Sequence, residues 1–431
     1  MLLRNFFQKL VDGFIYGLGF CLFSTFFIAL AGFGSGYLSL HEIKVKLQSS
    51  GVIATPKAQE EDEIATQVYK VFDQPALKIP TDYRKITVTN AQELRKAIPK
   101  EDETGKVAII LQAGEYNITK TIYILTDNVM IMSESGDPYD VVIRGPGMLR
   151  RGGDIGMIFR VSANHFYLDG ITLADVRNHL IQIAGESKAS YTMVNNCILQ
   201  DAYEQFIKVS YSKNTPDNKS IGGQITNSVF QYTKGVAKNY YTGGIDAIGA
   251  VDWLVDGNIF RDIASPQSYI SQHAVHFWTN SSGNIVSNNL FIDVDRAIGF
   301  GMRLPNSSSV IEYSHLGGKI ENNLIFHSDN GDPFADVGII VEAATDAEVI
   351  NNTIFMEHGY PRAIEYRFSD TQNILIKNNK TNKAIASRNG GTAQLIDNDE
   401  SMSKYEFLQE LTAVQNRLGV IDLYAPLSQQ D

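Results

Sequence analysis

The sequence predicts an all-β protein, a parallel β-helix of about ten stacked coils, and three observations lead to that prediction. A short phrase centred on asparagine returns along the chain, with successive spacings of 31, 31, 31, 34, 29 and 27 residues. Short β-rich segments flank each phrase, and a second set of apolar segments can be aligned after the variable loop of each repeat. A period of this size is typical of stacked, identical supersecondary units. The aligned asparagines are Asn196, Asn227, Asn258, Asn289, Asn323, Asn352 and Asn379.

The recurring asparagine has a physical reason. A chain that turns sharply between two short strands needs a residue that tolerates left-handed backbone angles, and asparagine does so better than other residues with a side chain. When coils stack, the amides of successive asparagines can also hydrogen-bond to one another along a column. We therefore expect one asparagine bend in each coil.

Composition excludes some classes of protein. The chain has 431 residues with 44% hydrophobic content, which indicates a folded protein. A formal charge of −11 and a pI near 5.3 argue against nucleic acid as a partner. Two cysteines, Cys21 and Cys197, are too few for a disulfide framework, and neither has a metal-type spacing. We expect Cys197 to be a small buried residue.

The N-terminal region predicts export. Residues Gly13 to Leu40 carry no charged side chain, which exceeds the roughly 20 residues needed to cross a bilayer. We expect a membrane anchor within residues 1–40, whereas cleavage near Ala31 would make the segment a signal peptide and the protein secreted. Both alternatives place the remainder on the extracytoplasmic, periplasmic side. Residues 41–79 are polar and predict a linker or stalk.

The β-helix is expected over residues 80–398, with a helical cap at each end. Asn90 followed by Glu93 is a helix-start signal, and the short apolar stripe after it predicts a capping helix over 90–98. An open end of a solenoid must be covered, which is the role expected for this helix. Residues 399–431 show a helical pattern and are predicted to form the C-terminal cap.

Together with the cap helix and the asparagine column, the phrase Gln112–Tyr116 resembles the first coil of the pectate-lyase-like (pectin-lyase-like) right-handed β-helix superfamily. The resemblance covers residues 80–398. It implies the fold more than an activity, because lyases, hydrolases, epimerases and non-catalytic proteins share this fold. The runs Gly244–Ala247 and His273–Trp278 are similar to segments of bacterial β-helix proteins that mostly lack an assigned function.

The second set of aligned segments predicts an outward-facing row. In segments such as Phe206–Val209 and Ala274–Phe277 the second and fourth residues are apolar and should point into the core. The third residues should then point outward, about 5 Å apart from coil to coil. These residues are Gln182, Lys208, Asp246, His276, Gly299, Ile340 and Glu365.

Part of this row has the groups that uronate chemistry requires. Removal of the proton beside a carboxylate needs a base and a cation that offsets the carboxylate charge. We assign His276 or Lys208 as the base, Asp246 as the group that orients it, and Arg296 as the cation. Exposed aromatic and polar residues nearby suit stacking on sugar rings. The residues expected to bind substrate are His273, Trp278, Tyr240, Tyr241 and Arg303.

These assignments predict a lyase or epimerase that acts on an acidic, uronate-containing polysaccharide. Two alternatives remain open, a non-catalytic β-helix that binds glycan or a protein partner at the cell envelope, and a glycoside hydrolase. Asp246 and Glu365 lie four coils apart, near 19 Å, which is too far for a glycosidase pair. A row of alternating charge is also what a solvated sheet surface needs.

A second group of residues suggests a metal site. Asp262, Asp293 and His327 each follow the repeat asparagine by four residues and should stack in one column. Stacked carboxylates repel one another, so Ca²⁺ between them is a possible cofactor. The alternative is that these residues begin loops, where aspartate hydrogen-bonds to its own backbone.

Overall fold

The computed structural model describes residues 77–101, 103, 105–149, 155–233, 235–266, 269–303 and 313–418. The predicted membrane anchor, the cleavage position near Ala31 and the predicted linker up to residue 76 lie outside the described residues. Within the described ranges, no helix is both long enough and apolar enough to span a bilayer.

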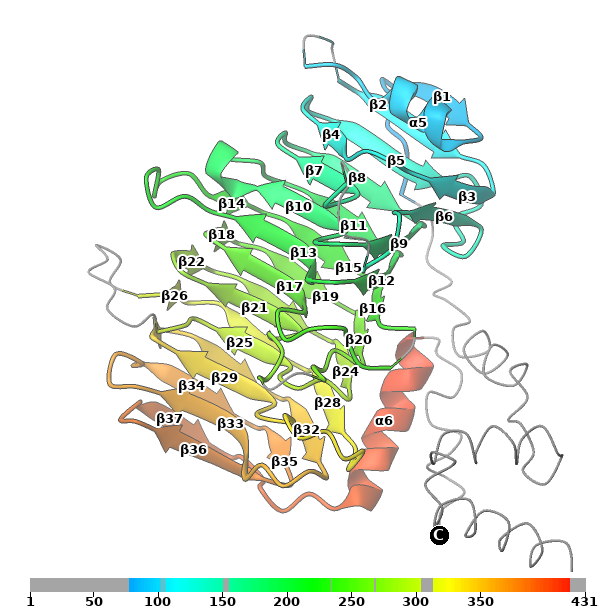
Figure 1. Ribbon diagram of the computed structural model, residues 1–431. Helices are drawn as coiled ribbons and strands as arrows, with labels where there is room; N and C mark the ends of the chain where they lie inside the picture. Colours follow the sequence, from blue (N-terminus) through cyan, green and yellow to red (C-terminus); the bar gives the residue numbers. More distant parts are fainter. Residues whose placement is uncertain are drawn as a thin grey trace, which may run out of the picture. The chain divides into compact units, whose positions relative to one another are not determined.

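The described chain winds through three long sheets and one short sheet, and every pair of neighbouring strands is parallel (Figure 1). Sheet A contains β1 (Arg84–Val88), β2 (Val107–Leu111), β5 (Val129–Ser133), β8 (Phe166–Asp169), β11 (Met193–Asn195), β15 (Gln224–Thr226), β19 (Leu254–Asp256), β23 (Ile285–Ser287), β27 (Lys319–Glu321), β31 (Glu348–Ile350), β34 (Ile374–Lys377) and β37 (Ala393–Ile396). Sheet B contains β3 (Gly114–Asn117), β6 (Val141–Arg144), β9 (Thr172–Val176), β12 (Ile198–Ala202), β16 (Val229–Gln231), β20 (Ile259–Arg261), β24 (Leu290–Ile292), β28 (Leu324–His327), β32 (Thr353–Met356) and β35 (Lys380–Thr381).

Sheet C follows sheet B in each coil. Its strands are β4 (Ile122–Ile124), β7 (Phe159–Val161), β10 (Ile181–Ala184), β13 (Gln205–Ser210), β17 (Gly243–Ile248), β21 (Val275–Trp278), β25 (Ile298–Phe300), β29 (Ile339–Glu342), β33 (Arg362–Arg367) and β36 (Ala384–Arg388). A single 3-10 turn, η1 (Gly185–Ser187), follows β10. The short sheet D contains β14 (Ser220–Ile221), β18 (Ala250–Val251), β22 (Ser281–Ser282), β26 (His315–Leu316) and β30 (Ala344–Thr345). The predicted all-β parallel β-helix is therefore confirmed.

Inward-facing apolar side chains form one continuous core along the stack. Phe230, Phe260 and Phe291 occupy equivalent positions of β16, β20 and β24. Their rings stack face to face, with centroids 4.5 and 4.9 Å apart. Because each coil repeats the same inward position, one type of residue can be stacked through several coils, and offset ring stacking stabilises that arrangement.

The asparagine column exists, but its alignment was wrong by one residue in two coils. The column runs through Cys197, Ser228, Asn258, Asn289, Asn323, Asn352, Asn379 and Asn398, each accepting a bond from the residue in the preceding coil or donating one to the next. Asn196 and Asn227 stand one position earlier, where they adopt the left-handed conformation, with φ of 50° and 49°. In the later coils Gly257 or a second asparagine takes that position. Turning and column bonding are thus done by two adjacent residues, and Cys197 is buried in the column as expected.

Two helices of the described ranges, α5 and α6, cover different parts of the solenoid. Helix α5 (Ala91–Ala97) begins at Asn90, whose side chain accepts a hydrogen bond from the Glu93 amide at 3.0 Å. Its Leu94 is fully buried in the core at the first coil, as a cap requires. Helix α6 (Lys404–Leu418) instead packs against the outer side of sheet B, where Phe407 stacks on Phe326 and Phe355 (Figure 1). The helix predicted to cap the C-terminal end therefore covers a lateral face.

Candidate functional site

The predicted row on sheet C has the expected register. Lys208 of β13 pairs with Asp246 of β17, and Asp246 pairs with His276 of β21. Gly299, Ile340 and Glu365 continue the row through β25, β29 and β33. The flanking residues point into the core, so the predicted alternation is correct. These outward residues are nevertheless not solvated: Asp246, His276, Ile340 and Glu365 are all at most 5% exposed.

Two side chains bind the carboxylate of Asp246, one at each oxygen. Lys208 forms a buried ion pair with Oδ2, and the indole Nε1 of Trp278 donates to Oδ1 at 2.5 Å. Burial alone would raise the pKa of Asp246, but the charge of Lys208 and the hydrogen bonds from Lys208 and Trp278 outweigh it and hold the pKa below its ordinary value. Asp246 therefore stays ionised and orients Lys208 and Trp278. The His276 ring lies parallel to that of Trp278, with ring centroids 5.5 Å apart.

His276 is a neutral imidazole with a defined tautomer. Its Nε2 lies 3.0 Å from the carbonyl oxygen of Gly301. Because a carbonyl only accepts, Nε2 carries the proton and Nδ1 carries the lone pair. Burial lowers the pKa of His276 to about 4, against the opposing effects of Asp246 and the Gly301 carbonyl. The ring is therefore uncharged at neutral pH and can accept a proton only at Nδ1.

His273 is the least satisfied polar group of the site. It is 5% exposed, and neither ring nitrogen has a hydrogen-bond partner. Its ring lies 4.3 Å from that of His276, and both rings stand over Gly299. A Cβ atom at Gly299 would lie 2.9 Å from His273 Nε2 and 2.9 Å from His276 Cδ2, so only glycine leaves room for the pair. Burial, followed by the charge of Arg296, holds the pKa of His273 well below its ordinary value.

Arg296 supplies the cation beside this imidazole pair. Its Nε and Nη2 donate to the carbonyl oxygen of Ser271 at 3.1 and 2.5 Å. Among the described residues no carboxylate lies within 4.0 Å of its guanidinium, although Asp336, Asp295 and Glu342 act on it from further away. Burial lowers the pKa of Arg296 from its ordinary value, and a guanidinium in a protein remains charged. A partly buried guanidinium without a direct carboxylate partner can bind an anion.

Beyond Gly299 the site continues with Glu365, a predicted member of the row, and with groups that the sequence did not single out, namely Glu342, Tyr360, Arg367 and Arg388. Glu342 and Arg367 pair in neighbouring strands and form an ion pair at 3.0 Å. Glu365 is fully buried and accepts from the Tyr360 hydroxyl and from Arg388. A signal for two of these residues was available, because outward positions recur every second residue. The residue two positions after each row member is Trp278 in β21, Glu342 in β29 and Arg367 in β33.

The remaining predicted binding residues lie outside this group. Tyr240 and Tyr241 are exposed on the loop before β17, and the Tyr240 ring contacts that of Tyr269 at 5.6 Å. Arg303 lies over the Phe368 ring, 4.8 Å from its centroid, and its backbone amide donates to Glu342. The structure thus brings Lys208, Asp246, His273, His276 and Trp278 together, with Arg296 beside them.

Comparison with known proteins finds a likeness of fold. No protein-family model and no curated protein matches the chain. An alginate lyase from Paenibacillus sp. str. FPU-7 aligns at a TM-score of 0.48 and 13% identity, covering 73% of this chain and 99% of that one. A pectate lyase, Pel9A, aligns at 0.40 and 12% identity, covering 74% and 79%. The adhesin PfbA of Streptococcus pneumoniae aligns at 0.43 and 12% identity, covering 72% and 89%.

The chain has the parallel β-helix fold that the asparagine column and the aligned apolar segments predicted. A parallel β-helix by itself selects no activity for this chain.

The predicted metal ligands do not form a coordination sphere. Within the part of the chain that the structure describes, no group of three or more His, Cys, Asp and Glu side chains is arranged to hold a metal ion. Asp262 pairs with Arg261, and His327 Nδ1 lies 3.8 Å from Asp293. Asp262 and Asp293 both have positive φ, 56° and 49°, directly after β20 and β24. They are therefore turn residues, and their left-handed conformation agrees with the loop-start alternative.

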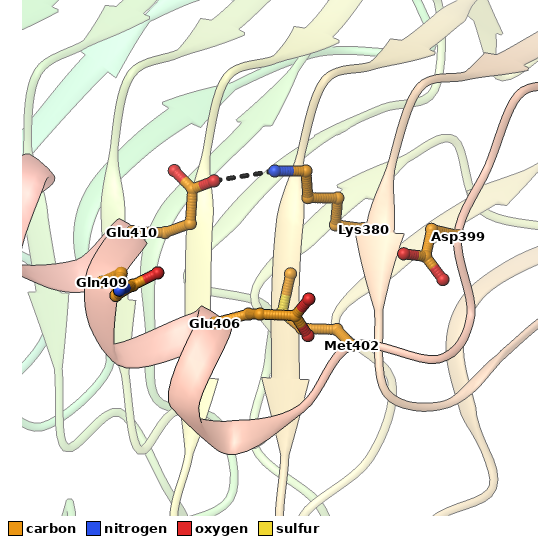
Figure 2. A pocket seen from close by; sticks show the side chains of 6 residues that line it. All are labelled: Lys380, Asp399, Met402, Glu406, Gln409 and Glu410. Carbon is orange, nitrogen blue, oxygen red and sulfur yellow. Dashed lines mark hydrogen bonds and ion pairs between the residues drawn. The ribbon is translucent and has the colours of Figure 1, made fainter.

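A pocket of 340 Å³ lies between α6 and β35 of sheet B (Figure 2). Lys380 crosses it to Glu410 at 2.8 Å, and Asp399 is bonded by Ser401. Met402, Glu406 and Gln409 complete the lining. Its main charged groups have partners within the pocket or its rim, so the pocket is explained by the packing of α6 on sheet B.

Proposed function

We propose that this protein is an extracytoplasmic enzyme that acts on an acidic polysaccharide, as a lyase or epimerase, at the outer face of sheet C. The observation that carries the proposal is His273, a buried imidazole with two unpaired nitrogens beside a guanidinium without a carboxylate partner. Buried polar atoms are nearly always hydrogen-bonded, and exceptions concentrate at functional sites. A uronate would supply what both groups lack.

The residues suggest how the first step would proceed. Arg296 would bind the uronate carboxylate and offset the negative charge that develops when the neighbouring carbon loses its proton. A bound carboxylate would also raise the pKa of the imidazoles next to it toward the working range. His273, or Nδ1 of His276, would accept the proton. In elimination the glycosidic carbon–oxygen bond then breaks and the leaving oxygen takes a proton, whereas in epimerisation a proton returns from the other face.

In this proposal Lys208 is not the base that the sequence predicted as one alternative. It is ion-paired with Asp246, and its ammonium lies 6.0 Å from the Trp278 ring centroid. A charged, paired lysine is not a base at neutral pH. We assign it to binding and orientation of Trp278, whose ring edge would border the sugar site.

A second candidate is a non-catalytic glycan-binding protein. It is favoured by the closure of the site, because His273, His276 and Asp246 are at most 5% exposed. The exposed Tyr240, Tyr241 and Tyr269 would then be the binding surface.

Product chemistry tests the proposal. The full chain is incubated with alginate and with polygalacturonate, with and without Ca²⁺, and ultraviolet absorbance and proton exchange from heavy water are followed. We expect an unsaturated product or exchange in the wild type, and loss of either in His273→Gln and Arg296→Gln but not in the control His315→Gln. Glycan binding without turnover or exchange would favour the second candidate.

Cell fractionation tests the location. The uncharged segment over residues 13–40 leads us to expect the protein in the membrane fraction, with the β-helix accessible to protease from outside the cytoplasm. Release into the medium with a mature N-terminus near residue 32 would instead support cleavage.

A further inference from the structure

One corner of the solenoid holds a column of residues in the left-handed conformation. The corner lies where each coil enters sheet A, after sheet D in the coils that have it. Backbone hydrogen bonds connect the column from coil to coil, such as Tyr191 N to Ile221 O at 2.7 Å and Gly222 N to Val251 O at 2.8 Å. The φ angles of its members lie between 53° and 65°. The members are Lys106, Asn128, His165, Tyr191, Gly222, Asp252, Gly283, Gly317, Asp346 and Asn373.

Tyr191 has the bulkiest side chain of this column. Glycine, asparagine and aspartate adopt left-handed angles readily and histidine less so, whereas a bulky aromatic residue there is strained. Such strain costs on the order of 1–3 kcal/mol and persists mostly at ligand clamps and other functional positions. The φ of 58° at Tyr191 therefore needs a compensating interaction or a functional reason.

The ring of Tyr191 belongs to a short aromatic stack. It lies parallel to the His165 ring, with centroids 4.8 Å apart and an angle of 8°. The His165 ring in turn lies 6.4 Å from Tyr167, whose hydroxyl is 3.3 Å from His165 Nδ1. In the next coil a Cβ atom at Gly222 would lie 2.8 Å from Tyr191 Cδ1. Glycine at that position is what gives the Tyr191 ring its room.

This stack is on the surface. The side of the molecule around Tyr191 is open, since Tyr191 is 46% exposed and Ile221, in the next coil, is 40% exposed. A strained aromatic ring that remains half in water gains only part of the burial that would stabilise a core residue. Packing alone therefore does not account for Tyr191.

We propose that Tyr191, His165 and Tyr167 form a glycan-binding platform that stacks on the C–H face of a pyranose ring, at a corner separate from the outer row of sheet C. Sugar rings combine an apolar face with hydroxyls at the rim, and tyrosine offers the matching combination of ring face and phenolic hydroxyl. The ring edges of His165 and the two tyrosine hydroxyls would meet the sugar hydroxyls. A nucleobase would also stack, but the formal charge of −11 disfavours a nucleic acid.

The platform does not depend on catalysis at sheet C. A second sugar site at this corner would bind one part of a long polymer while the outer row of sheet C binds another part. Linking two sites on one polymer raises the overall affinity well above that of either site.

The experiment measures binding and stability together. Wild type, Tyr191→Asn, Tyr191→Phe and the control Tyr405→Ala are compared by affinity electrophoresis in alginate, polygalacturonate and laminarin, and by thermal unfolding. Tyr405 is exposed on α6 and makes a matched control. Each variant is also made with Arg296→Gln, so that binding at the outer row of sheet C is removed from the comparison.

We expect Tyr191→Asn to weaken binding at least tenfold while its unfolding midpoint stays the same or rises, because asparagine relieves the left-handed strain. Tyr405→Ala should bind like the wild type. Tyr191→Phe keeps the ring and loses only one hydroxyl contact, so it should weaken binding much less than Tyr191→Asn does. The proposal is overturned if the wild type binds none of the three glycans, if Tyr191→Asn binds as tightly as the wild type, or if it unfolds at a clearly lower temperature, since the ring would then be structural. If the wild type shows no turnover but still binds glycan in a way that depends on Tyr191, the enzyme proposal is overturned and the platform proposal stands.

Discussion

The asparagine column and the sheet C row around His273 are both buried, both polar and both built from one residue per coil, yet they differ in how their polar atoms are satisfied. In the column, Asn323 accepts from the amide and side chain of Asn289 and donates to Asn352 and to the Val286 carbonyl. At the pair of imidazoles His273 and His276 beside this row, both nitrogens of His273 are without a partner. The first arrangement is explained by the fold alone. The second is not, which makes it the better candidate for function.

The Lys208–Asp246 pair lies between these two cases and should give the largest effect on stability. Its side chains are 12% and 7% exposed, so Lys208→Met would leave a buried carboxylate without its cation. We expect a loss of about 3–5 kcal/mol in the free energy of unfolding. Urea denaturation measures it, and Lys208→Met with Asp246→Leu should recover most of the loss.

Acid should weaken the same pair. The pKa of Asp246 lies below its ordinary value, so its contribution is present above the pKa of the unfolded chain and is lost as the pH falls through the folded value. If the single variant Lys208→Met is as stable as the wild type, the Lys208–Asp246 ion pair does not stabilise sheet C.

The asparagine column should be the next most sensitive region. Asn323→Ala removes an amide that bonds two neighbouring coils, leaves the backbone amide of Asn289 unpaired and removes the side-chain donor to the Val286 carbonyl. We expect a loss of about 1–3 kcal/mol, from the unsatisfied amide and the lost bonds between coils. Asn322→Gly is the control, because Gly257 occupies the equivalent left-handed position. It should change stability by about 0.5 kcal/mol or less. Equal effects of the two variants would contradict the division of roles between adjacent residues.

Buried histidines should make the fold sensitive to acid below pH 6.5. Burial lowers the pKa of His315 to about 3, and its Nδ1 has no partner. The unfolded chain therefore binds a proton that the folded chain does not, and stability falls as the pH decreases from 6.5 toward that value, by up to about 1.4 kcal/mol per unit. His315→Gln should flatten this part of the stability curve relative to the wild type, with both proteins referenced at pH 8. An unchanged slope would mean that His315 does not titrate with unfolding.

His273 should show the smallest effect on stability and the largest on activity. The ring nitrogens of His273 make no hydrogen bonds. His273→Leu therefore removes no hydrogen bond that stabilises the fold, and it adds apolar contact at a buried position. We expect the free energy of unfolding to stay within about 1 kcal/mol of the wild type or to increase. Turnover of acidic polysaccharide should be abolished. A large loss of stability would place His273 with the asparagine column and remove the contrast between the two regions.

The sequence was most informative where coils repeat. Its period located the strands, and the alternation of apolar residues gave the correct register from Lys208 to Glu365. The alignment failed at Asn196 and Asn227, because two adjacent positions both favour asparagine for different reasons. Exposure was also mispredicted. A residue can point away from the core and still be covered by its own neighbours, as Asp246 is by Lys208 and Trp278.

By itself the sequence determined the parallel β-helix, the N-terminal cap and the row that carries Asp246 and His276, because these depend on local periodicity. The tertiary structure alone decided which polar groups have partners. His273, Arg296 and Glu342 come from three separate coils. How closely the imidazole rings approach Gly299, where a Cβ atom would lie 2.9 Å from His273 Nε2, depends on how those coils stack. Distances between coils are set by packing across the whole solenoid, and no pattern within a single repeat contains them.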